Sequence, residues 1–103
     1  MTDLFNTQLE LDFNAPAPAP MNIIKAIRDL TFWNDHSQAV VLLAEHFGTS
    51  QQLTEAKRVK ELHREAGSID SYLFNRREVV KMQILVSIAH TNLDLYTQIE
   101  KAF

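Results

Sequence analysis

From Met21 to Phe103, apolar residues recur at the three- and four-residue spacing of amphipathic helices. The first series consists of Ile23, Ile24, Ile27 and Leu30. Phe32 and Trp33 mark the end of this predicted helix. After it, Asp35 and Gln38 have the spacing of a capping box, which predicts a second, mostly apolar helix over 35–47. Gly48 is expected to end that helix in the left-handed conformation.

A third helix is predicted between a capping box of Thr49 and Gln52 and a terminal Gly67. A short turn follows at 68–70, and the capping-box spacing of Asn75 and Glu78 then predicts a long helix over 76–90. This helix is apolar almost all round, so we expect it in the middle of the fold or in the interface of a homodimer. The polar residues at 90–92 either break it or leave it continuous to Phe103.

These patterns predict an all-α fold, a small bundle of four or five helices over residues 21–103. Helices 35–47 and 76–90 should supply its central core, with Val41, Leu43, Ile84 and Ile88 buried. A chain of 103 residues fits one such domain.

The first twenty residues have a different pattern. Leu9, Leu11 and Phe13 alternate with polar residues, as in an extended chain that presents one apolar side. Three Ala-Pro units follow at 15–20, and each proline removes a backbone donor and disfavours helix at the residue before it. We therefore expect residues 1–20 to form an extended, mobile tail.

The hexapeptide from Gln8 to Phe13, Gln-Leu-Glu-Leu-Asp-Phe, resembles the peptide by which bacterial polymerases and repair factors bind the DNA sliding clamp. That motif is Gln-Leu-any-Leu-any followed by Leu or Phe. The resemblance implies that Gln8 hydrogen-bonds at the rim of the clamp pocket. It also implies that Leu11 and Phe13 fill the pocket, with Leu9 packed beside them.

Two other interpretations of residues 8–13 stay open at this point. The segment suits a binding peptide for a different protein, because an extended chain can place alternate side chains in pockets of any partner. It also suits an edge strand, folded onto its own domain or exchanged with a second copy. The position of the segment ahead of a proline spacer favours a ligand.

Leu43–Ser50 resembles the first helix and turn of a helix-turn-helix, because Ala44 precedes Gly48 by four residues. The following helix departs from the family pattern, since Thr49 and Thr54 stand where apolar residues are expected. It nevertheless carries side chains suited to bases and phosphates: Gln51, Gln52, Lys57, Arg58 and Lys60. Acidic residues alternate with them, which is equally typical of an ordinary solvated helix.

Arg76 and Arg77, with Lys81, form a second basic group. They are expected either to pair locally with Glu78 in a solvated first turn or to contact a phosphate or an acidic partner.

The net charge of −3 comes entirely from the first twenty residues, where Asp3, Glu10 and Asp12 are the only charged side chains. Residues 21–103 hold ten acids and ten bases and are formally neutral. A neutral domain has no overall field that would draw it onto nucleic acid.

Several classes of site are disfavoured by what the chain lacks. Without cysteine there is no disulfide, thiolate zinc site or cysteine nucleophile, and the four histidines have no metal-ligand spacing. There is also no glycine-rich phosphate loop and no paired-carboxylate pattern. We therefore expect no enzymatic activity, no metal and no cofactor.

The absence of a signal peptide or a long apolar run predicts a cytoplasmic protein that does not enter membranes. Taken together, these features indicate a small adaptor or inhibitor that acts through protein contact, with the sliding clamp as its candidate partner. Its size and simplicity are typical of proteins encoded by a phage, a plasmid or another mobile element. The alternative is a transcriptional regulator of the helix-turn-helix type.

Overall fold

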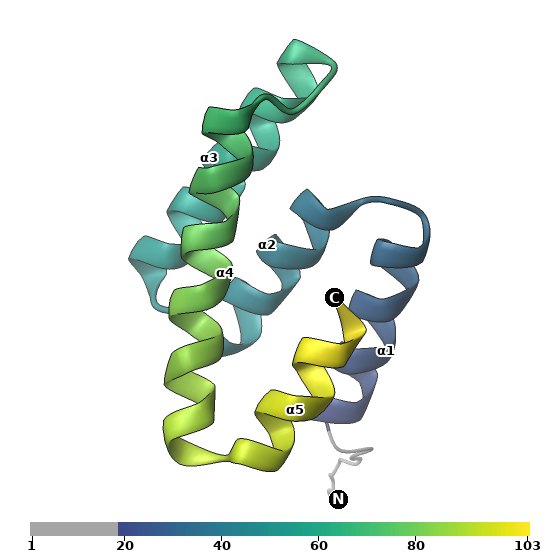
Figure 1. Cartoon of the computed structure of the whole chain (residues 1–103), viewed down its shortest axis with the longest axis vertical. Coiled ribbons are helices and arrows are strands. Elements are labelled where there is room, and N and C mark those ends of the chain that lie inside the picture. Colours follow the sequence, from purple (N-terminus) through teal and green to yellow (C-terminus); the bar gives the residue numbers. More distant parts are fainter. Residues whose placement is uncertain (1–18) are drawn as a thin grey trace, which may run out of the picture.

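The computed structural model describes residues 19–103, which form five helices and no strand (Figure 1). The helices are α1 (Ala19–Phe32), α2 (His36–Phe47), α3 (Ser50–Ala66), α4 (Ser71–Thr91) and α5 (Leu93–Ala102). The all-α prediction is therefore confirmed. The predictions made for residues 1–18 lie outside the described part of the chain.

The start of α1 corrects the predicted boundary of the tail. Ala19 and Pro20 are helical, so the domain begins two residues before Met21. Proline is tolerated in the first turn because its missing N–H has no partner there in any helix.

Short turns separate the first three helices. Asn34 adopts a left-handed φ of 63°, and Asp35 then caps α2 by accepting a hydrogen bond from the Gln38 amide at 3.3 Å. The predicted capping box of Thr49 and Gln52 is present in both directions, at 3.1 and 2.9 Å. These caps satisfy backbone donors that a helix start leaves free.

The prediction for Gly48 was wrong. This residue has φ −98° and ψ 172°, an extended conformation open to any amino acid. Its role is spatial, because a Cβ atom there would lie 3.0 Å from both the Cα and the carbonyl oxygen of Ala44. Gly67 does end α3 in the left-handed region, at φ 76°, as predicted.

The longest helix begins earlier than the sequence suggested. Asp70 accepts a 2.8 Å hydrogen bond from the Leu73 amide, so α4 starts at Ser71 and the separate turn at 68–70 with a new helix at Asn75 was wrong. Of the two alternatives left open for residues 90–92, the structure shows the break. Asn92 ends α4 and also caps α5, through a hydrogen bond from the Leu95 amide at 3.0 Å.

The helices pack around α2 and the inner face of α4. α2 contacts α1, α3 and α4, while α5 folds back from α4 onto α1 (Figure 1). The four predicted core residues, Val41, Leu43, Ile84 and Ile88, are all buried. However, α4 is not covered all round, since Val79, Met82 and Val86 remain about half exposed on its outer face.

Candidate functional site

The residues predicted to bind a clamp, Gln8, Leu9, Leu11 and Phe13, all precede the described part of the chain. The chain enters the domain at Ala19, at the end where α4 turns into α5 (Figure 1). The site that can be built from side-chain geometry is therefore the second one, the polar surface of α3 and its neighbours.

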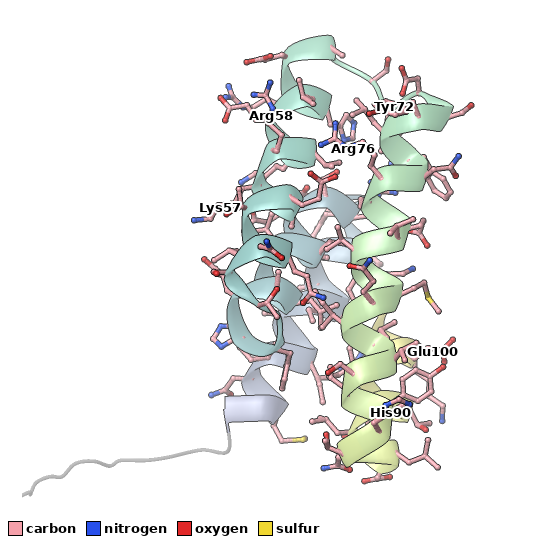
Figure 2. All side chains as sticks on the ribbon, turned by 90° about the vertical axis from the view of Figure 1, so that its left-hand side faces the viewer. Lys57, Arg58, Tyr72, Arg76, His90 and Glu100 are labelled. Carbon is pink, nitrogen blue, oxygen red and sulfur yellow. The ribbon has the colours of Figure 1, made fainter. Side chains whose placement is uncertain are left out.

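The structure places the seven candidate nucleic-acid-binding residues in separate environments. Gln51, Gln52 and Arg76 line a groove between α3 and α4, whereas Lys57 and Lys60 line a groove between α2 and α3. Arg58, which lies between Lys57 and Lys60 in the sequence, is exposed on α3 and lines neither groove (Figure 2). Arg77 lies in neither groove and is only 7% exposed. These side chains consequently do not form one continuous basic surface.

In the α3–α4 groove, Arg76 is held by Glu55. Its Nε and Nη2 donate to the two carboxylate oxygens, each at 2.7 Å, in a bidentate pair. The hydrogen bond from Arg76 holds the pKa of Glu55 below its ordinary value, and the Glu55 carboxylate raises the pKa of Arg76. The guanidinium also lies over the Tyr72 ring, 5.5 Å from its centroid (Figure 2). Glu55 occupies the Nε–Nη2 edge of the guanidinium and balances its charge, which weakens the attraction of Arg76 for a phosphate.

Replacing Arg76 by leucine should raise the pKa of Glu55 and destabilise the protein by about 1 kcal/mol at pH 7, since the pair is partly exposed. Because the folded-state pKa of Glu55 is lowered, its stabilising effect is present above its unfolded pKa and is lost as the pH falls through the folded pKa. The difference between wild type and variant should therefore shrink below about pH 4. Urea unfolding of both chains at several pH values measures this difference in the free energy of unfolding.

Arg64→Leu is the matched control for this experiment. Arg64 pairs with Glu61 at 3.3 Å on the surface, where both side chains are more than half exposed. Its loss should change stability by less than about 0.5 kcal/mol. An equal cost for the two leucine variants would show that the Glu55–Arg76 pair has no special contribution.

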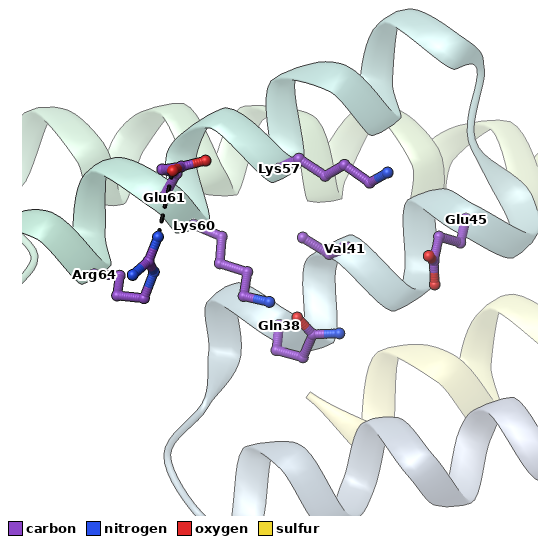
Figure 3. Close-up of a pocket in the computed structure, with 7 residues that line it drawn as sticks. All are labelled: Gln38, Val41, Glu45, Lys57, Lys60, Glu61 and Arg64. Atoms are coloured by element: carbon purple, nitrogen blue, oxygen red, sulfur yellow. Dashed lines mark hydrogen bonds and ion pairs between the residues drawn. The ribbon is translucent and has the colours of Figure 1, made fainter.

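The α2–α3 groove has mixed charge and a volume of about 330 Å³. Figure 3 shows the residues around it: Gln38, Val41, Glu45, Lys57, Lys60, Glu61 and Arg64. Two carboxylates among three cations weaken the attraction for a phosphate. The side-chain oxygen of Gln38 is buried there without a hydrogen-bond partner among residues 19–103. The groove thus offers a polar contact surface, not a dedicated phosphate site.

A buried polar network joins α2, α3 and α4. The Nη1 of Arg77 donates to Ser37 Oγ at 3.1 Å, and the same hydroxyl lies 3.0 Å from Nδ1 of His63. Burial lowers the pKa of Arg77, whose Nε has no hydrogen-bond partner within the described residues. The guanidinium also lies over the Phe74 ring at 5.4 Å. Sequence reasoning missed this network, although Arg77 shares the inward spacing of Leu73, Val80 and Ile84.

A serine hydroxyl beside a histidine nitrogen can form a nucleophile and base. Here the serine is 4% exposed and accepts a hydrogen bond from a guanidinium, and the His63 side chain hydrogen-bonds only to Ser37 within residues 19–103. A triad would need a third group that orients the histidine. The geometry accordingly fits a structural network that binds three helices together.

Residues 19–103 contain no cluster of three or more histidine or carboxylate side chains that could hold a metal ion. Nor does any helix of that region combine the length and the apolar character required to cross a membrane. Both observations are restricted to the described helices.

Comparison with protein families, with curated proteins and with solved structures finds no match to this chain. The function must therefore be argued from its own residues.

Proposed function

We propose that this protein is a small interaction protein, an adaptor or inhibitor, that binds the DNA sliding clamp through residues 8–13 and modulates replication or repair. The observation that carries the proposal is the hexapeptide Gln-Leu-Glu-Leu-Asp-Phe ahead of three Ala-Pro units. A cytoplasmic location follows from the proposal, because a bacterial clamp acts on DNA there.

The physics of such a contact is simple. An extended peptide places alternate side chains in pockets while its partner satisfies its backbone groups. A few buried anchors contribute most of the affinity, and the ordering of the peptide opposes binding. We therefore expect a dissociation constant in the micromolar range for one copy, or about −8 kcal/mol.

A synthetic peptide spanning residues 5–15 tests the proposal by calorimetry against a bacterial sliding clamp. Leu11→Ala and Phe13→Ala should each weaken binding by about 2 kcal/mol, because each empties a desolvated pocket. Gln8→Ala should cost about 1 kcal/mol through lost hydrogen bonds. Glu10→Ala is the control from the same peptide and should be nearly neutral, since its side chain faces solvent in the proposed pose.

Two results would count against a clamp ligand. One is undetectable binding of both the peptide and the full chain at clamp concentrations far above micromolar. The other is an equal loss for Glu10→Ala and Phe13→Ala, which would indicate a partner that reads charge.

A helix-turn-helix regulator is the second candidate, supported by the exposure of Gln51, Lys57 and Arg58 on α3. The engagement of Arg76 with Glu55 and the burial of Arg77 argue against it. The two candidates separate when residues 1–18 are removed, a truncation that keeps the first turn of α1. The truncated chain should lose clamp binding but keep any binding of duplex DNA by α3. Replacing Lys57 and Arg58 by alanine should weaken that DNA binding.

A further inference from the structure

The outer face of α4 carries a row of side chains that the other described helices leave largely exposed. We define the α4 strip as Tyr72, Asn75, Val79, Met82, Val86 and Ala89. Val79, Met82 and Val86 are 55%, 46% and 48% exposed, and Tyr72 is 66% exposed. The strip lies directly opposite the buried row of Leu73, Val80, Ile84 and Ile88, so α4 is apolar on two opposite faces.

The spacing along the strip alternates between three and four residues without interruption, which is the heptad pattern of a two-helix seam. The three-then-four order assigns Tyr72, Val79 and Val86 to position a, and Asn75, Met82 and Ala89 to position d. Val79 and Val86 at position a are β-branched, as in two-stranded parallel pairs. The alternation is therefore compatible with a second helix as the occupant of the strip.

We propose that the α4 strip pairs with the same strip of a second copy of this chain, in parallel and in register. The inference does not rest on the proposed function, because nothing in it uses residues 8–13 or the clamp.

Charge supports a second copy as the occupant. The stretch from Met82 to Ala89 contains no charged residue, and the positions beside the seam are Gln83, at e, and the buried Leu85, at g. The nearest charges are neutralised within each copy, Glu78 by Lys81 at 2.8 Å and Arg76 by Glu55. Two copies can therefore approach without opposing like charges, whereas a charged partner would find no complement on the strip.

The size of the surface suits a weak dimer that forms at high protein concentration. The four large side chains of the strip are about half exposed or more, and an apolar hollow bounded by Val79, Met82, Gln83 and Val86 lies at its centre. With the flanking residues, a helix face of about 30 Å in length exposes several hundred Å². A standard, stable interface buries about 800 Å² on each partner, so this smaller face should pair weakly.

Asn75 sets the register. In the parallel, in-register pair, Asn75 of one copy faces Asn75 of the other, so the two side-chain amides can hydrogen-bond to each other. A shift by one heptad would place the amide against Met82 and leave a buried polar group without a partner.

This arrangement has a geometric consequence for the rest of the chain. α1 begins at the end of the domain where α4 finishes (Figure 1). A two-fold axis parallel to α4 therefore brings both Ala19 residues to the same end of the dimer. Two copies of residues 1–18 would then leave from one end, which suits a target with repeated identical pockets.

Sedimentation equilibrium of the full chain tests the proposal with a matched pair of variants. Met82→Glu introduces a charge on the strip, and Met21→Glu introduces the same charge at a residue that is 58% exposed elsewhere. We expect the wild type to reach a dimer, Met82→Glu to weaken dimerisation at least tenfold, and Met21→Glu to leave it unchanged. Both variants should keep the wild-type circular dichroism, because neither side chain belongs to the core.

The direction of pairing is tested by Ala89→Cys, since the chain has no native cysteine. Parallel, in-register d positions lie close enough for a disulfide. Mild oxidation should therefore cross-link two copies of the Ala89→Cys variant, and Met21→Cys should not cross-link.

Three results would overturn the proposal. The first is a wild-type chain that stays monomeric at millimolar concentration. This result overturns the proposal even if residues 1–18 of the same chain cover the strip. The second is equal weakening of the dimer by the two glutamate substitutions. The third is a dimer in which the Ala89→Cys variant forms no disulfide between copies.

Discussion

Replacing Leu43 by alanine should lower the free energy of unfolding by about 3–4 kcal/mol. Leu43 is fully buried at the centre of α2, where α1, α3 and α4 all meet that helix. The substitution removes apolar contacts and leaves a cavity that surrounding helices can fill only in part. Because a domain of this size is stable by about 5–10 kcal/mol, the variant should lose a large share of its stability. Urea unfolding followed by circular dichroism measures the change.

Leu93→Ala is the matched control, since the same side chain is 66% exposed at the start of α5. It should cost less than about 1 kcal/mol when measured at a protein concentration too low for self-association. A loss at Leu93 as large as that at Leu43 would contradict the assignment of the inward face of α2.

Ser37→Ala should destabilise the protein by about 2–3 kcal/mol, the second largest effect expected from the structure. The hydroxyl is the acceptor for Nη1 of Arg77, and its loss leaves a buried guanidinium without that partner. Hydrogen bonds to buried charged groups contribute more than neutral ones, and an unmatched donor keeps its full desolvation cost. Ser87→Ala, an exposed serine on α4, should be nearly neutral.

A double variant separates this explanation from a simple packing defect. Arg77→Leu removes the buried charge, so Ser37→Ala in that background should cost less than about 1 kcal/mol. Full additivity of the two single changes would show that Ser37 and Arg77 do not depend on each other. Thermal unfolding of the four chains completes the cycle.

The helices could be predicted from the sequence because their apolar spacing and their caps agree. Thr49 with Gln52, Asp35 and Gly67 all act as their residue types suggest. The start of α4 was misplaced because Asn75 has a cap-like spacing to Glu78, while Asp70 provides a cap more than one turn earlier. The prediction for Gly48 was wrong because a glycine can be required either for a positive φ or because no Cβ atom fits at its position. Only the packed structure shows that Gly48 is the second case, with Ala44 in the way of a Cβ.

The polar sites were harder to predict, since charge pairing depends on which helices become neighbours. Arg76 and Arg77 are adjacent in sequence, yet they point to different places because successive helical residues are about 100° apart. One meets Glu55 across the α3–α4 groove, and the other reaches Ser37 in the interior. The spacing from Leu73 to Ile84 could have identified Arg77 as inward-facing, but nothing local identifies Ser37 as its acceptor.

The contact between α1 and α5 determines the order in which the fold can be completed. Ile99 and Ala102 are buried, and Thr31 Oγ1 donates to the Ala102 carbonyl oxygen at 2.8 Å, across 71 residues of sequence. Contacts of such separation form late, because the intervening loop must close first. During synthesis the side of α1 that meets α5 therefore stays uncovered until α5 has left the ribosome. A ribosome that stalls before Ile99 would present an unfinished apolar surface to the chaperones around the exit tunnel.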